Sequence, residues 1–247
     1  MRRKGWLLVS LLWLSFGASA TTVDLTPVAD SSVAFSDSGN LNNNSGNSVN
    51  IFVGSGGLRE QRTYIRFDLS SLSGQISAAE LKLSIAGNNG LAKTNLFGLN
   101  DGDTGENWGE TTITWANAPG AGEADQGGYR TLDSNKVMLL KSRNDVASFQ
   151  TDDVMSFQGQ NIVDFLNNDT NNMVTFILTD GENAYYAYNS FDGIAFWSKE
   201  KGGGYPAPTL TLTTVPLPPA AVLFVSALAG LTFVGRRKGR ARVGGPA

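Results

Sequence analysis

Short apolar runs alternate with polar residues along most of the chain, and clusters of Gly, Asn, Ser and Asp separate them. A period of two is typical of strands that bury one face, and the separating residues favour tight turns. The clearest runs, each predicted to turn one face inward and one outward, are 63–69, 80–85, 174–178 and 209–213. The pattern predicts an all-β domain, an antiparallel β-sandwich over residues 21–214, with one short helix at 161–166.

The N-terminus has the pattern of a secretory signal peptide. Basic residues at 2–4 precede an apolar stretch over 6–16. Ala18 and Ala20 are the small residues that a signal peptidase needs beside its cleavage site. An uncleaved anchor is the alternative, but the stretch is short for a bilayer crossing. The pattern predicts that residues 1–20 are removed by signal peptidase and that the protein is exported.

The pattern near the C-terminus predicts a membrane-sorting segment over 215–242. A proline-rich motif leads into an apolar stretch predicted to form a transmembrane helix at 217–235, and five basic residues follow within 236–242. The stretch is close to the length that a bilayer crossing requires, and basic residues after such a helix stay in the cytoplasm. The motif consists of Val215, Pro216, Leu217, Pro218 and Pro219.

This order of motif, helix and basic cluster resembles the PEP-CTERM sorting tail of Gram-negative bacteria. The resemblance implies that an exosortase-type membrane enzyme removes the tail. It also implies that the protein is held transiently in the inner membrane before it reaches the cell surface or the extracellular matrix. Leu217 stands where that motif has Glu. A simple C-terminal membrane anchor is the alternative.

The body between these two segments is more acidic than the whole chain, because neither segment contains Asp or Glu. Eight of the 19 Lys and Arg residues lie in the segments, which leaves eleven against all 22 acidic residues and a net charge of −11. Such a body repels phosphate backbones, so we expect no nucleic-acid partner. The chain has no Cys and no His, which excludes disulfides and the commonest catalytic base.

Several blocks of the body resemble the DNRLRE domain. They are RTYIRFDLSSL at 62–72, Trp-Gly-Glu at 108–110 and Ile-Thr-Trp-Ala-Asn-Ala-Pro at 113–119, supported by 28–30 and a closing strand from Pro208. The resemblance covers roughly residues 22–213 and implies a β-sandwich of jelly-roll type. Such domains are accessory modules of surface proteins and polysaccharide-degrading enzymes, and some recognise acidic polysaccharide such as alginate. No catalytic residues come with the resemblance.

Candidate glycan-binding residues follow from two patterns. In the strand at 62–69, alternate residues beginning at Thr63 form the predicted core face, and the opposite face carries guanidinium groups and a phenol that suit a sugar ligand. Aromatic rings elsewhere can stack on a pyranose. The alternatives are a solvated, salt-bridged face and ordinary aromatic packing. The candidates are Arg62, Tyr64, Arg66, Trp108, Tyr186 and Tyr188.

An acidic, glycine-rich loop is the candidate for structural calcium. It places oxygen-bearing side chains at nearly alternate positions, as calcium prefers, although its spacing is not that of an EF-hand. A solvated turn is the alternative. The candidate ligands are Asn100, Asp101, Asp103 and Glu106.

Together these features predict an exported, non-catalytic protein of the bacterial surface or exopolysaccharide matrix that binds or organises polysaccharide. A purely structural matrix protein without glycan binding is the alternative. A polysaccharide-degrading enzyme is a further alternative, but no pair of carboxylates stands out among the acidic residues. Without Cys or His, nucleophilic catalysis also lacks its usual groups.

Overall fold

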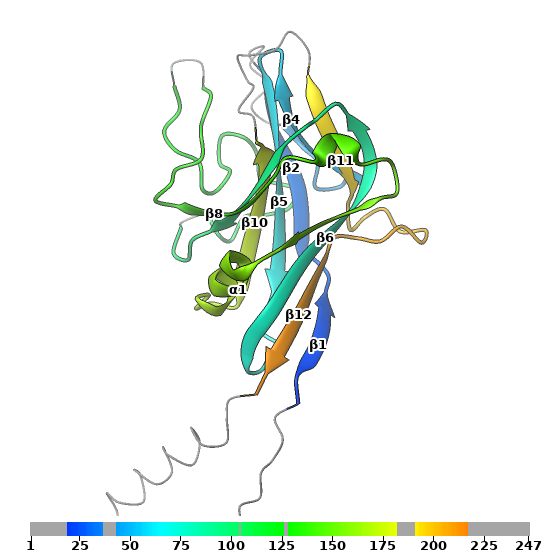
Figure 1. Cartoon of the computed structure of the whole chain (residues 1–247). Coiled ribbons are helices and arrows are strands. Elements are labelled where there is room, and N and C mark those ends of the chain that lie inside the picture. Colours follow the sequence, from blue (N-terminus) through cyan, green and yellow to red (C-terminus); the bar gives the residue numbers. More distant parts are fainter. Residues whose placement is uncertain (1–18, 37–42, 104, 126–127, 182–190, 217–247) are drawn as a thin grey trace, which may run out of the picture. The chain divides into compact units, whose positions relative to one another are not determined.

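The computed structural model of the chain describes residues 19–36, 43–103, 105–125, 128–181 and 191–216 (Figure 1). Residues Thr21–Thr214 form one compact unit. In this part of the chain the elements are β1 (Thr21–Leu25), β2 (Ala29–Ser36), β3 (Asn43–Asn44), β4 (Asn50–Gly56), β5 (Arg59–Asp68), β6 (Gln75–Asn89), β7 (Thr94–Leu99), β8 (Val137–Arg143), a 3₁₀ turn (Val146–Ser148), β9 (Val154–Gln158), α1 (Gln160–Asn167), β10 (Met173–Asp180), β11 (Asp192–Trp197) and β12 (Thr209–Val215).

The strands join into one curled sheet in the order β1-β12-β6-β11-β4-β5-β10-β7-β8. β2 and β3 extend the sheet from β5, and β9 extends it from β6. The strand pairs with an assigned register are antiparallel, from Thr21 opposite Thr214 to Thr94 opposite Arg143. The predicted all-β, mainly antiparallel fold is confirmed, and the curled sheet is consistent with a β-sandwich.

β6, β12 and α1 follow their sequence patterns. In β12, Leu210 and Leu212 are fully buried, whereas the alternate residues Thr209 and Thr211 are partly exposed. β6 likewise buries Leu81, Leu83 and Ile85 and leaves Glu80 and Lys82 partly exposed. The predicted helix at 161–166 is confirmed as α1, whose apolar face packs into the same core as these two strands. For β6 and β12, the prediction of one inward and one outward face is confirmed.

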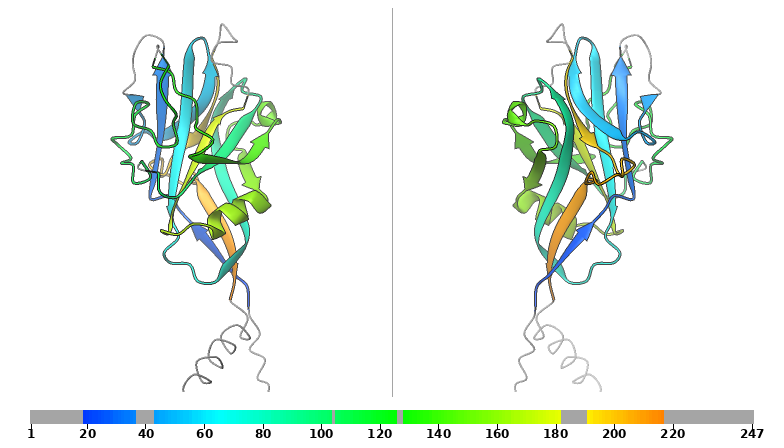
Figure 2. Two further views of the ribbon diagram at one scale, coloured as in Figure 1. Left: turned by 90° about the vertical axis from the view of Figure 1, so that its left-hand side faces the viewer. Right: turned by 90° about the vertical axis from the view of Figure 1, so that its right-hand side faces the viewer.

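β5 and β10 depart from that prediction, because they are buried on both faces. Ile65 and Phe67 of β5 belong to one hydrophobic core, and Tyr64, which precedes Ile65, belongs to a second. In β10, Phe176 and Ile177 divide between the two cores in the same way. The prediction of an outward face was wrong here because the chain between β7 and β8 covers it. Figure 2 shows this irregular segment and α1 on opposite sides of the central strands.

The predicted membrane and processing segments fall almost entirely beyond the described ranges. The transmembrane helix predicted at 217–235, most of the signal peptide and the basic cluster lie there. Among the residues that the structure does describe, no helix combines the length and apolar character needed to cross a membrane.

The contact between α1 and β7 leads to a stability prediction. A Cβ atom added at Gly98 would lie 2.5 Å from the ring of Phe165, whereas one added at Gly87 would have no atom within 4 Å. We expect Gly98→Ala to lower the free energy of unfolding by about 1–3 kcal/mol, because the buried ring must shift. Gly87→Ala, also within a strand, should leave it unchanged or raise it by about 0.5–1 kcal/mol. Urea unfolding measures both, and equal effects would contradict the proposed clash.

Candidate functional site

The chain between β7 and β8, residues 100–136, covers the second face of the central strands. Its Trp115 is 2% exposed and stacks on Tyr129 with ring centroids 5.8 Å apart. The side chain of Asn117 fixes the local turn: its oxygen accepts from the Thr114 backbone N–H at 2.6 Å, and its amide donates to the Thr112 carbonyl at 3.0 Å. The Thr-Trp-Ala-Asn block therefore forms a turn that presents its indole to the core.

A buried group of polar residues lies beneath this cover. Arg62 donates from Nε to Glu60 Oε1 at 2.5 Å and from Nη2 to the Arg130 carbonyl at 2.6 Å. The Tyr129 hydroxyl donates to the other oxygen of Glu60. The guanidinium also lies 4.3 Å from the centre of the Trp115 ring. Because both carboxylate oxygens have donors, the buried charges of Arg62 and Glu60 are compensated.

Tyr64 lies in the interior beside this group. It is fully buried, and its hydroxyl donates to the Pro119 carbonyl at 3.3 Å. Burial raises the pKa of Tyr64 to about 12, and burial followed by the charge of Glu60 raises the pKa of Tyr129. Both phenols therefore remain protonated at neutral pH. Arg62 and Tyr64, which the sequence placed on one candidate ligand face, serve here as interior residues.

A pocket of about 360 Å³ opens beside the Arg62–Glu60 pair, over β5, β7, β8 and β10; we call it the β5–β8 pocket. Asp180, at the end of β10, lines it and accepts a hydrogen bond from the Ser55 hydroxyl. Leu139 on β8 is 47% exposed and forms part of its apolar wall. The lining residues on which the argument depends are Ser55, Glu60, Arg62, Asn95, Leu139 and Asp180.

The lining of the β5–β8 pocket suits a ligand rich in hydroxyl groups. Carboxylate, amide and hydroxyl side chains can exchange hydrogen bonds with such a ligand, and the neighbouring apolar wall can contact its carbon skeleton. Glu60 and Asp180 are acidic, and Arg62 is already bonded to Glu60. Among the described residues that line it, the pocket therefore offers no uncompensated positive charge to an anionic sugar.

Arg66 and Trp108 come together at a different place. Arg66 Nη1 donates to the Trp108 carbonyl at 2.8 Å, and the guanidinium lies 5.0 Å from the centre of the indole ring. Trp108 is 6% exposed, and its Nε1 donates to Thr175 Oγ1 at 3.1 Å. Arg66, half-buried, lines a second pocket of about 390 Å³ with Asp103 and Glu106. The indole face that the sequence offered to a sugar is thus covered by Arg66.

The four calcium candidates are not brought together as one ligand set. Asp101 and Glu106 gather with Asp169, with one carboxylate oxygen of each within 4.8 Å of the others. Asp103 instead caps backbone N–H groups of Gly105 and Gly120, at 3.0 and 3.2 Å. Asn100 donates from its side chain to the Asn135 carbonyl.

Asp169 was missed by sequence reasoning because it follows α1 and lies far along the chain from the acidic loop. Burial raises its pKa to about 6, and the charges of Asp101 and Glu106 contribute. Asn95, Leu139 and Asp180 of the β5–β8 pocket were also missed. Their residue types are ordinary for strands and strand ends, so no local signal in the sequence marks them.

Other predicted site residues fall at or beyond the edges of the described ranges. Tyr186, Tyr188, Ala18 and residues 217–219 of the sorting motif lie outside them. Ala20 directly precedes β1, Val215 ends β12 and Pro216 follows it.

Comparison with protein families gives one match over the folded unit. The model of carbohydrate-binding module family 96 matches residues 21–214. A search of curated proteins finds no match.

The buried polar group gives a prediction for stability. Tyr129→Phe should lower the free energy of unfolding by about 1.5–3 kcal/mol, because Glu60 loses the donor of a buried hydrogen bond to a charged group. Tyr205→Phe is the matched control, since Tyr205 is 42% exposed, and it should change stability by less than about 0.5 kcal/mol. Urea unfolding at pH 7 measures both variants. A Tyr129→Phe protein as stable as the control would show that the hydroxyl does not support the Arg62–Glu60 pair.

Proposed function

The chain belongs to carbohydrate-binding module family 96, and on this basis we propose that the protein binds polysaccharide through the β5–β8 pocket without cleaving it. The match spans the whole compact unit, so the binding role belongs to the folded body and not to a terminal segment. The observation that supports the location is the pocket itself, where hydroxyl, amide and carboxylate groups stand beside the exposed side chain of Leu139. We assign the curled sheet to the jelly-roll type of β-sandwich.

A neutral, hydroxyl-rich polysaccharide is the ligand class that the pocket supports best. The Asp180 carboxylate can accept hydrogen bonds from sugar hydroxyls, and such bonds are strong because the acceptor is charged. A uronate would instead bring its own negative charge toward Glu60 and Asp180 in a body with a net charge of −11. The acidic polysaccharides that some DNRLRE domains recognise are therefore the less favoured ligands for this chain.

The state of Glu60 supports binding without catalysis. A glycosidase needs two carboxyl groups that can exchange protons or attack the sugar. Arg62 and Tyr129 hold both oxygens of Glu60, and Glu60 is only 5% exposed. Such a carboxylate has no oxygen available for proton transfer to a sugar.

We further propose that the protein acts at the cell surface or in the exopolysaccharide matrix. The signal-peptide pattern and the PEP-CTERM-like tail support export, processing by signal peptidase and an exosortase-type enzyme, and transient anchoring in the membrane. A polysaccharide binder released in this way would connect matrix polymers with one another or with the cell. A purely structural matrix role is the competing proposal, and absence of glycan binding would favour it.

Affinity electrophoresis of the purified protein through gels that contain single polysaccharides tests the binding role. We expect retardation by a neutral polysaccharide and weaker retardation by alginate. Leu139→Ala should weaken affinity about fivefold, or about 1 kcal/mol, because it removes part of the apolar wall.

Met138→Ala is the matched control for this substitution. Met138 is the neighbouring exposed residue of β8, with an exposed fraction of 38%, and it does not line the pocket. Its affinity should equal that of the unaltered protein. Equal loss in both variants would place the site elsewhere, and mobility unchanged in a broad panel would leave the structural role.

Processing gives a separate prediction. In mass spectra of the protein from its native cells, the mature chain should begin at Thr21 and end near Val215, because signal peptidase and the sorting enzyme remove the two terminal segments. Detection of the intact basic cluster at 236–242 in the mature protein would instead identify a retained membrane anchor.

A further inference from the structure

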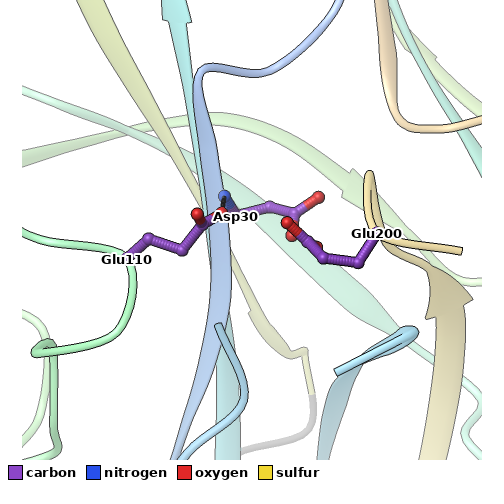
Figure 3. A group of neighbouring side chains, drawn as sticks. All are labelled: Asp30, Glu110 and Glu200. Atoms are coloured by element: carbon purple, nitrogen blue, oxygen red, sulfur yellow. Dashed lines mark hydrogen bonds between the residues drawn. The ribbon is translucent and has the colours of Figure 1, made fainter. Parts of the chain in front are cut away.

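Three carboxylates from three separate segments meet beside the beginning of β2. Asp30 belongs to β2, Glu110 to the covering segment and Glu200 to the loop between β11 and β12 (Figure 3). One carboxylate oxygen of each lies within 4.8 Å of the others. None of the three lines the β5–β8 pocket.

Backbone contacts fix the positions of these side chains. Glu110 Oε1 accepts from the Asp30 backbone N–H at 2.8 Å, and Asp30 Oδ2 accepts from the Lys199 backbone N–H at 2.8 Å. Asn44 donates from its side chain to the Glu110 carbonyl at 2.8 Å. A Cβ atom at Gly46 would lie 2.1 Å from that carbonyl oxygen, so glycine is required for the close approach. Backbone N–H groups and Asn44 therefore hold the three carboxylates in place.

Two carboxylate oxygens of the group have no partner among the described residues. Asp30 is fully buried, yet its Oδ1 accepts no hydrogen bond. Glu200 Oε2 is also buried and accepts none. An ionised oxygen without a donor is costly in a protein interior, and such exceptions call for a bound ligand or a proton.

The charge of the group is also incomplete. Lys199 Nζ lies 3.0 Å from Glu110 Oε1 and contacts Glu200 Oε1, but it balances only one of the three negative charges. Arg66 also attracts Glu110 electrostatically, but these two cations do not equal the three carboxylates in charge.

We propose that Asp30, Glu110 and Glu200 bind one calcium ion, which joins β2, the covering segment and the β11–β12 loop. Calcium takes oxygen ligands at about 2.3–2.6 Å, so ligands on opposite sides of the ion are about 4.8 Å apart. The three oxygens lie within this distance of one another, so one ion can contact all of them. The absence of His and Cys from the chain favours an oxygen-seeking cation over zinc. The ion's role is to stabilise the fold.

The second acidic group, Asp101, Glu106 and Asp169, is a weaker candidate and a useful control. Asp101 is exposed, and its Oδ2 already accepts two hydrogen bonds from Thr170, at 2.7 and 2.6 Å. None of its three members is fully buried. Asp169 Oδ1 is buried there and accepts no hydrogen bond from the described residues, but solvent and Thr170 already satisfy Asp101.

Isothermal calorimetry of CaCl₂ with the EDTA-stripped, full-length protein tests the proposal. We expect calcium to bind, and the affinity to fall at least tenfold in Asp30→Asn and in Glu200→Gln. Asp101→Asn should leave this affinity unchanged. If Asp30→Asn fails to fold, Glu200→Gln decides alone, because its side chain is 22% exposed and tolerates substitution more easily. No binding by the unaltered protein, or loss of binding in Asp101→Asn alone, would overturn the proposal.

Lys199→Met separates an ion site from a group that Lys199 already neutralises. If calcium is the missing charge, removing the neighbouring ammonium should tighten calcium binding at least tenfold and increase the rise in melting temperature on adding calcium. If Lys199 is the sole counter-ion, the variant should be destabilised to the same extent with and without calcium, and the proposal fails. The backbone hydrogen bond from Lys199 to Asp30 is kept in this variant, so the comparison isolates the side-chain charge.

Discussion

Burial of β5 on both faces is the constraint on which the rest of the structure depends. β5 pairs with β2 along one edge and with β4 and β10 along the other, so its backbone is fully occupied within the sheet. Its side chains then enter two separate hydrophobic cores. The central residues of such a strand cannot reach water, so a polar side chain buried on its second face needs a partner inside the protein. Arg62 meets this demand through Glu60, the Arg130 carbonyl and the ring of Trp115.

The covering segment, residues 100–136, supplies the partners that this buried face needs. Its backbone forms turn hydrogen bonds, such as Gly122 N–H to the Thr131 carbonyl, and side chains add to them, as Asn117 does within its turn and Asn44 does from β3. Its large rings supply the apolar area that closes the second core. Where the cover ends, the polar group around Glu60 reaches the surface and borders the β5–β8 pocket. The β5–β8 pocket therefore lies where the covering segment meets strands β7 and β8.

The sequence predicted those parts of the fold that depend on local periodicity. β12, β6 and α1 each have one apolar face and one polar face, and each was placed correctly with its buried side. β5 has the same alternation of Arg and Tyr with apolar residues, which on its own indicates a solvated face. Only the tertiary contact with Trp115 and Tyr129 buries that face, and no pattern within β5 reveals a cover that comes from a segment some fifty residues further on.

The candidate sites also divide into residues that the local sequence marks and residues that only the fold brings together. The acidic loop was visible in the sequence, but Asp169 joins it only through the fold. Asp30, Glu110 and Glu200 are isolated acidic residues in the sequence, and three distant segments must pack before their carboxylates meet.

The covering segment also connects the two proposed sites. Glu110 at one position of this segment belongs to the calcium group, and Tyr129 at another holds the carboxylate that borders the β5–β8 pocket. A segment outside the strands of a sheet belongs to the less stable parts of a protein unless side chains or ligands fix it. An ion at Asp30 would join this segment directly to β2, the neighbour of β5. An ion that fixes this segment against β2 would also limit the movement of Tyr129 and Glu60 beside the β5–β8 pocket.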